Sequence, residues 1–198
     1  MRSGIILAGG RSTRFHGEEK SLKIVRGKRM ICRVIDSISG IVDEIIISVR
    51  DEEQRKRVYE FIPQQFPFVY DEIPDIGPLS GVYSGLRKAS GDYVVILACD
   101  MPFINSDVID LLFREAMGHD AAVPRRENRF LEPLHAIYAR EPMLRAVEDA
   151  IKHGEQRIAS PLNWLNDVVY VSEDKIKEVD PNLYTFLNVN RAEDMPLD

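Results

Sequence analysis

Short runs of branched apolar residues alternate with helical patterns along the first two-thirds of the chain. The apolar runs lie at residues 4–7, 44–49, 67–70 and 93–98, with a weaker run at 121–124. The helical patterns lie between them, at residues 30–39, 52–61, 81–89 and 105–117. Parallel strands that are buried on both faces are continuously apolar and are joined through helices. The order therefore predicts an α/β fold, with a mostly parallel sheet whose strands end at one edge.

The last third of the chain has a less regular pattern. Strand-like runs lie at residues 134–138, 168–171 and 185–187, and a helical pattern lies at 141–153. Ser160 followed by Pro161 predicts a further helix start, with the serine as cap and the proline in the first turn. Asn105 is expected to cap the helix over 105–117 in the same manner. Because no linker, repeat or low-complexity stretch interrupts residues 1–198, the chain is expected to form one domain.

A glycine pair, Gly9 and Gly10, follows the first predicted strand directly, and the cations Arg14 and Lys20 come after it. Glycine lets a backbone approach a phosphate closely, and the cations would neutralise a polyphosphate held there. Nucleotides bind at this point in α/β folds. The segment matches neither the G-x-G-x-x-G nor the P-loop pattern, which argues against a dehydrogenase or a P-loop kinase. Taken alone, the glycine pair is equally consistent with a simple turn.

A carboxylate, Asp100, follows the apolar run 93–98 almost at once. The run aims it at the same sheet edge as the glycine pair. There it would hold a divalent metal, because Mg²⁺ prefers one or two protein carboxylates together with phosphate oxygens. The alternative is that Asp100 only caps a turn before Pro102. The shared edge favours the metal-binding interpretation.

A third segment runs from Tyr70 to Gly81 and contains the turn-forming pair Gly77-Pro78. Its acidic residues, Asp71 among them, would repel phosphate but would accept hydrogen bonds from a nucleobase or a ribose. Without other context, a polar connection with a rigid turn explains the segment equally well.

The bulk properties exclude several classes of protein. The net charge of −6 argues against nucleic-acid binding through a basic surface. The absence of a long apolar run argues against a membrane span, and we expect a cytoplasmic protein. The two cysteines, Cys32 and Cys99, are far apart and indicate neither a disulfide framework nor a zinc site.

The order of five motifs resembles that of molybdenum cofactor guanylyltransferases, which belong to the nucleotidyltransferases with a Rossmann-like fold. The motifs are L-A-G-G-x-x-x-R from Leu7, then Lys20, G-P-L-x-G from Gly77, C-D-x-P from Cys99, and N-x-N from Asn188. The resemblance extends from Leu7 to Asp194. It implies a three-layer α/β/α nucleotidyltransferase domain, with residues 1–118 as the nucleotide-binding part and 119–198 as the acceptor-binding part.

The resemblance also implies the reaction and its site. Such enzymes join GTP to molybdopterin, form the guanine dinucleotide cofactor and release pyrophosphate. Catalysis would rest on Arg14, Lys20 and Asp100, with Asp100 as the ligand of Mg²⁺. The expected nucleotide-binding residues are Leu7, Ala8, Gly9, Gly10, Lys20, Ser48, Asp71 and Asp100. Asn188 and Asn190 would bind the acceptor.

The chain departs from the family pattern at two points. His16 replaces a common glycine, and Ser48 stands where asparagine is common. A molybdopterin cytidylyltransferase and a sugar-phosphate nucleotidylyltransferase therefore remain alternatives. A nucleotide-binding assembly protein for molybdoenzymes is a third, although a silent protein would not need Arg14, Lys20 and Asp100 together. A molybdoenzyme or a cofactor-assembly protein is the expected partner, and the chain is expected to be a monomer or a weak homo-oligomer.

Overall fold

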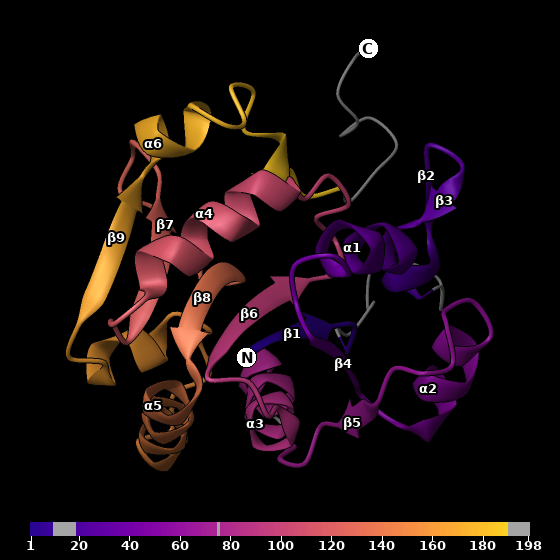
Figure 1. Cartoon of the computed structure of the whole chain (residues 1–198). Coiled ribbons are helices and arrows are strands. Elements are labelled where there is room, and N and C mark those ends of the chain that lie inside the picture. Colours follow the sequence, from indigo (N-terminus) through magenta and orange to yellow (C-terminus); the bar gives the residue numbers. More distant parts are fainter. Residues whose placement is uncertain (10–18, 75, 190–198) are drawn as a thin grey trace.

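Seven strands form one sheet in the order β5-β4-β1-β6-β8-β7-β9 (Figure 1). The computed structural model describes residues 1–9, 19–74 and 76–189. The strands are β1 (Arg2–Leu7), β4 (Glu44–Val49), β5 (Phe68–Tyr70), β6 (Tyr93–Ala98), β7 (Ala121–Arg125), β8 (His135–Ala139) and β9 (Val168–Ser172). A separate hairpin consists of β2 (Ile24–Val25) and β3 (Lys28–Arg29).

Within the described residues, six α-helices and three 3₁₀ helices join the strands. The α-helices are α1 (Met30–Ile38), α2 (Glu52–Tyr59), α3 (Pro78–Lys88), α4 (Ser106–Ala116), α5 (Arg140–Lys152) and α6 (Glu173–Lys177). The 3₁₀ helices are η1 (Lys20–Leu22), η2 (Ser160–Trp164) and η3 (Tyr184–Phe186).

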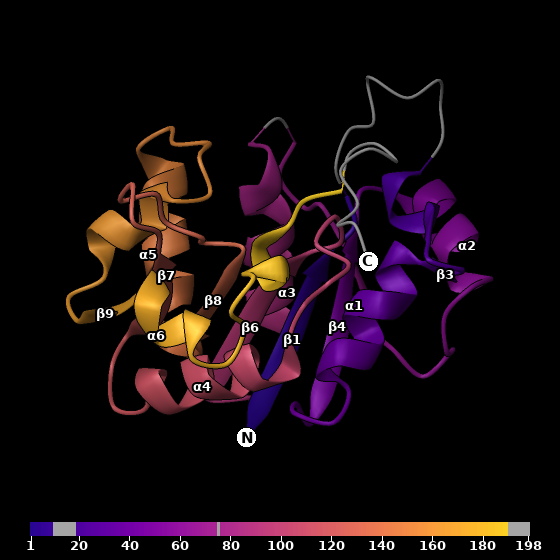
Figure 2. The ribbon, with the colours of Figure 1, turned by 90° about the horizontal axis from the view of Figure 1, so that it is seen from above.

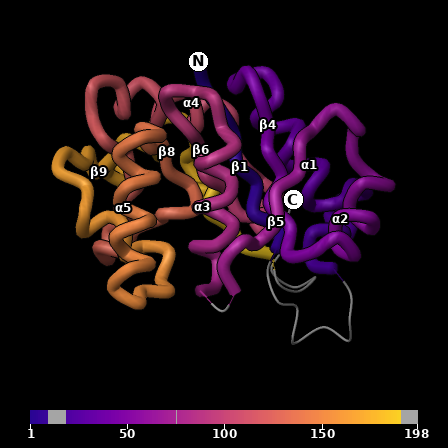
Figure 3. Tube along the Cα trace, turned by 90° about the horizontal axis from the view of Figure 1, so that it is seen from below, coloured from indigo at the N-terminus to yellow at the C-terminus, as the bar shows by residue number. Residues whose placement is uncertain are grey.

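Each face of the sheet is covered by its own set of helices, so the molecule has three layers. Alternate residues of a strand enter different cores: Ile6 packs with α1 and α4, whereas Ile5 packs with α3 and α5. The four strands β1, β4, β5 and β6 pair in parallel. Figure 3 shows α3 and α5 side by side on one face of the sheet. The three-layer α/β/α architecture predicted from the sequence is confirmed.

One strand runs against the others. β8 pairs antiparallel with both β6 and β7, while β9 is parallel to β7. The expectation that every strand ends at one edge is therefore wrong for β8. His135, at its start, pairs with Leu97 near the end of β6. The loop before β8, rather than the loop after it, therefore lies at the edge of the sheet where β6 ends.

Two local predictions fail and one is confirmed. Residues 185–187 do not form a strand, because Tyr184–Phe186 is a 3₁₀ turn. Ser160 does not cap η2, since its hydroxyl donates to Glu155 instead, at 2.7 Å. Asn105 does cap α4, where its side-chain oxygen accepts from the Asp107 amide at 2.8 Å.

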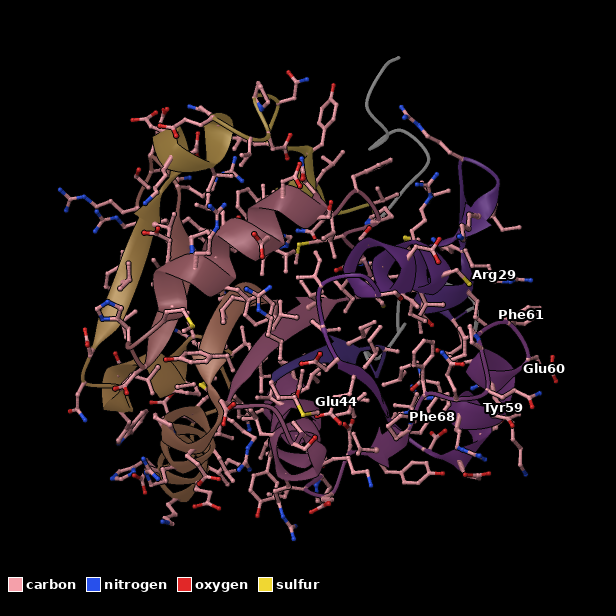
Figure 4. The ribbon with its side chains drawn as sticks, viewed as in Figure 1. Arg29, Glu44, Tyr59, Glu60, Phe61 and Phe68 are labelled. Atoms are coloured by element: carbon pink, nitrogen blue, oxygen red, sulfur yellow. The ribbon has the colours of Figure 1, made fainter. Side chains whose placement is uncertain are left out.

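The connections around α2 are held by aromatic contacts (Figure 4). The guanidinium of Arg29 lies 3.6 Å from the ring centre of Phe61, and the rings of Tyr59 and Phe68 lie 6.3 Å apart. These contacts attach α2 to β5 and to the β2–β3 hairpin.

Among the described helices, none has the length and apolar character needed to cross a membrane.

The order of the strands reverses direction at β1. The chain passes from β1 to β4 and β5 on one side, and then to β6 on the other, so that β1 lies between β4 and β6 (Figure 2). In open α/β sheets, ligands bind at such a switch point, outside the carboxyl ends of the strands. Three backbone hydrogen bonds join these ends: Ala8 N–H to Ser48 C=O, Asp71 N–H to Val49 C=O and Cys99 N–H to Leu7 C=O.

Candidate functional site

A lysine and an aspartate meet at the switch point. Lys20 begins η1, and Asp100 lies in the turn that follows β6. The Lys20 Nζ and the Asp100 Oδ2 are 2.5 Å apart, and the two side chains are 24% and 25% exposed. A cation and an anion that face the open edge of the sheet can both act on a phosphate with its metal. The structure thus brings together two of the three residues predicted to be catalytic.

A cavity of about 650 Å³ opens at the ends of β1, β4 and β5. Four residues predicted to bind the nucleotide line it, namely Leu7, Gly9, Ser48 and Asp71. The remaining lining comes from Arg50, Ile73, Pro74, Gly77, Pro78, Gly81 and Gln156. Its size and mixture of apolar and polar walls are typical of a small-molecule pocket.

Gly81 lets α3 approach this cavity closely. A Cβ at this position would lie 2.4 Å from Ser48 Oγ, 3.2 Å from Leu7 Cδ2 and 3.3 Å from Asp71 Oδ1. Only glycine fits without displacing these three side chains. Gly77, which precedes α3, has a φ of +61°, a backbone conformation that glycine adopts easily because it has no Cβ. The G-P-L-x-G motif is therefore explained by the contact between α3 and the wall of the cavity.

Asp71 is the titratable group of the cavity. Burial raises the pKa of its carboxyl to about 6, the nearby Arg50 opposes the shift, and Asp51 adds to it. A carboxylate that is partly desolvated accepts hydrogen bonds strongly, because water competes less for it. At pH 7 it would still be mostly ionised and able to accept from N–H or O–H groups of a nucleoside.

Exchange of Asp71 for asparagine is expected to raise the free energy of unfolding more at pH 8 than at pH 5. A carboxyl whose pKa is raised on folding favours the native state below its unfolded pKa, and this contribution is lost as the pH rises through about 6. The gain should be on the order of 1 kcal/mol, less than the full shift, because solvent screens a partly exposed carboxyl. Urea unfolding of both proteins at the two pH values measures it.

The exposed neighbour Glu72 provides the control, since Glu72→Gln removes a carboxylate that does not line the cavity. The prediction would be contradicted if Asp71→Asn and the parent protein differed in free energy of unfolding by the same amount at pH 5 and at pH 8.

The C-terminal segment, yellow in Figure 2, returns to the end of β6. The Val189 amide donates to the Asp100 carbonyl at 2.9 Å, and the Val189 side chain packs with Val25 and Met30. Asn188 is exposed beside this contact.

Three predicted site residues, Gly10, Arg14 and Asn190, lie outside the described residues. Ala8 is buried and contacts Ser48 through its backbone.

Arg50, Gln54 and Gln156 were not predicted from the sequence. Arg50 and Gln156 line the cavity, and Gln54 is buried between α2 and the end of β1. None of the three belongs to a motif considered above. Arg50 follows the predicted strand 44–49 as Asp100 follows 93–98, and this position was the only available signal.

The described residues contain no group of three or more His, Cys, Asp or Glu side chains that could enclose a metal ion. Asp100 supplies one carboxylate at an open edge. That donor set fits Mg²⁺ bound jointly by one protein carboxylate, phosphate oxygens and water, which is the way Mg²⁺ is commonly held beside nucleotides.

Comparison with known proteins identifies the family. Residues 4–168 match the model described as the MobA-like NTP transferase domain. The chain is 40% identical to the probable molybdenum cofactor guanylyltransferase of Methanosarcina mazei, over 98% of this chain and 88% of that protein. This chain belongs to the MobA-like NTP transferase family. The relative named probable molybdenum cofactor guanylyltransferase in Natronomonas pharaonis is 36% identical, over 98% of this chain and 95% of that protein.

A solved structure of the MobA-like type has the same fold. The molybdopterin-guanine dinucleotide biosynthesis protein A of Archaeoglobus fulgidus superposes with a TM-score of 0.79 at 30% identity, over 98% of this chain and 94% of that one. The resemblance inferred from the five motifs is thus confirmed for MobA-like transferases. The roles of the individual site residues remain predictions.

Proposed function

We propose that the protein transfers GMP from GTP to the terminal phosphate of molybdopterin, releasing pyrophosphate and forming molybdopterin guanine dinucleotide. The observation that carries the proposal is the near-full-length likeness to proteins named molybdenum cofactor guanylyltransferase. The cavity beside the Lys20–Asp100 pair supports it, because a nucleoside and its phosphates need adjacent apolar and charged regions.

The reaction requires positioning and charge neutralisation rather than a side-chain nucleophile. The phosphate of the acceptor attacks the α-phosphorus of GTP in line with the departing pyrophosphate, and both reactants are anions. Cys99, beside the site, is buried, and burial raises the pKa of its thiol to about 12, so that it stays protonated. Cys99 is therefore not the attacking group, which agrees with attack by the phosphate of the acceptor.

Lys20 and Asp100 divide the electrostatic work. Lys20 neutralises charge on the phosphates and on the pyrophosphate that leaves, and Asp100 holds the metal at the same place. Mg²⁺, when bound, would supply further positive charge to the phosphates.

The base would lie in the cavity between β4 and α3. The Asp71 carboxylate would accept hydrogen bonds from guanine N–H groups or ribose hydroxyls, and Ser48 Oγ lies beside it. Arg50, which also lines the cavity, adds a donor that can face a carbonyl oxygen of the base. A donor and an acceptor on the walls of one cavity suit a nucleobase, whose edge presents both kinds of group.

The test is product formation from GTP and molybdopterin with Mg²⁺, with pyrophosphate as the readout. GTP should be used in preference to CTP, ATP and UTP. Preferred use of CTP would reassign the protein as a cytidylyltransferase. Binding of GTP without release of pyrophosphate would favour the non-enzymatic assembly role. A molybdoenzyme or an assembly protein as partner, and a monomer or weak homo-oligomer, are part of the same proposal.

A further inference from the structure

Gln54 is a completely buried polar side chain outside the predicted site. It lies in α2 and is 0% exposed. Its amide nitrogen donates to the Ala8 carbonyl at 2.8 Å and to Glu19 Oε2 at 2.6 Å, and its amide oxygen accepts from the Arg50 N–H at 2.8 Å. Every hydrogen-bonding group of the side chain thus has a partner. A flipped amide would place its oxygen against two acceptors, so these partners fix its orientation.

The two acceptors lie at either end of the glycine-rich segment. Ala8 precedes Gly9 at the end of β1, and Glu19 immediately precedes Lys20. One amide nitrogen therefore ties together two points that are 11 residues apart in the sequence, on either side of the segment that carries the predicted phosphate contacts. The Arg50 N–H adds the end of β4 to the same contact.

Glu19 is held from a second side. Its side chain is 8% exposed, and its Oε1 accepts from the Arg57 guanidinium at 2.8 Å. Arg57 lies one turn after Gln54 on α2, so two partners of Glu19 come from one helix, and the Arg50 guanidinium adds a longer contact at 3.8 Å. A buried carboxylate with two donors in fixed places has little freedom. Its neighbour Lys20 begins η1, which puts Nζ 2.5 Å from Asp100.

We infer that Gln54 is a positioning residue for nucleotidyl transfer: by joining Ala8 to Glu19 it fixes Lys20 opposite Asp100, where the triphosphate is bound. This inference rests on the proposed function. It assigns α2, which does not line the cavity except through the adjoining Arg50, a role in phosphate binding. Gln54 itself touches neither the cavity nor the phosphates.

The first test is Gln54→Met, which keeps the length of the side chain and removes its hydrogen bonds. The affinity for Mg·GTP is expected to fall about tenfold, whereas the affinity for guanosine, which would occupy the cavity, should change less than twofold. Both are measured by titration calorimetry on the full chain. Gln64→Met, the same exchange at an exposed position, is the control and should change neither affinity.

The second test swaps the amide of Gln54 and the carboxylate of Glu19. Gln54→Glu alone places two carboxylates at the Gln54–Glu19 contact and should weaken Mg·GTP binding more than Gln54→Met does. Adding Glu19→Gln restores an amide–carboxylate hydrogen bond with donor and acceptor reversed. The double variant should recover at least threefold in affinity, although the Ala8 carbonyl still lacks its donor.

The inference is overturned if Gln54→Met weakens GTP and guanosine equally, if it weakens neither, or if the double variant binds no better than Gln54→Glu. These measurements need no acceptor. A parent protein that binds Mg·GTP but transfers nothing to molybdopterin would refute the proposed function and leave this comparison intact.

Discussion

Exchange of Asp100 for asparagine is expected to lower the turnover with GTP and molybdopterin on the order of a thousandfold. The exchange removes the carboxylate proposed to hold Mg²⁺, and it also removes the anion that lies 2.5 Å from Lys20 Nζ. Loss of a single preorganised electrostatic contact costs about a hundredfold to a thousandfold in rate, and here two roles are lost together. Release of pyrophosphate at saturating Mg²⁺ and saturating substrates measures the effect.

Asp107→Asn is the matched control, because Asp107 is an exposed carboxylate on α4 and should be dispensable for turnover. The thermal unfolding of Asp100→Asn should stay close to that of the parent protein, since Asp100 is a partly exposed turn residue. Near-normal turnover of Asp100→Asn in Mg²⁺ would remove Asp100 from the site.

Exchange of Lys20 for methionine is expected to lower kcat/KM for GTP on the order of a hundredfold, with most of the loss in the triphosphate interaction. Lys20 is the first residue of the 3₁₀ turn η1 and lies beside Asp100, and methionine keeps the aliphatic stem while removing only the ammonium. The affinity for GTP should therefore fall much more than the affinity for guanosine, as measured by titration calorimetry with Mg²⁺ present.

Lys88→Met serves as the control, because Lys88 is exposed at the far end of α3 and its loss should leave both affinities unchanged. Lys20→Arg should recover only part of the activity, since the guanidinium is larger and planar where the ammonium is a compact charge. Equal weakening of GTP and guanosine by Lys20→Met would contradict a role in phosphate binding.

Hydrophobic pattern alone predicted most of the sheet. Glu44–Val49 and Tyr93–Ala98 were predicted with their observed bounds, because runs buried on both faces are apolar without interruption. The direction of β8 was not predicted, since His135–Ala139 has the same apolar character whichever way it runs. The segment around Thr185 and Phe186 looked like a strand because its buried residues are β-branched or aromatic, but it forms a 3₁₀ turn.

Site residues that directly follow a predicted strand were found from the sequence. Site residues that other parts of the fold bring to the cavity were missed. Leu7, Gly9, Ser48 and Asp71 line one cavity, as the rule of shared carboxyl ends leads one to expect. Gln54 comes from a helix, and nothing in its local sequence marks it. Gln156 comes from a distant loop, in the segment 153–157, which resembles a family segment but gave no role to Gln156. Their positions follow from how α2 and the segment after α5 pack on the sheet, which is tertiary information.

The hydrogen bond from the Val189 amide to the Asp100 carbonyl has a consequence for biosynthesis. A chain emerging from the ribosome exposes β1, β4, β5 and β6 long before residue 189 leaves the exit tunnel. These four strands would thus assemble with the backbone of the turn at Asp100 still untethered. We expect the turn at Asp100 to take its final shape only after residue 189 has been made, well after the four parallel strands are complete.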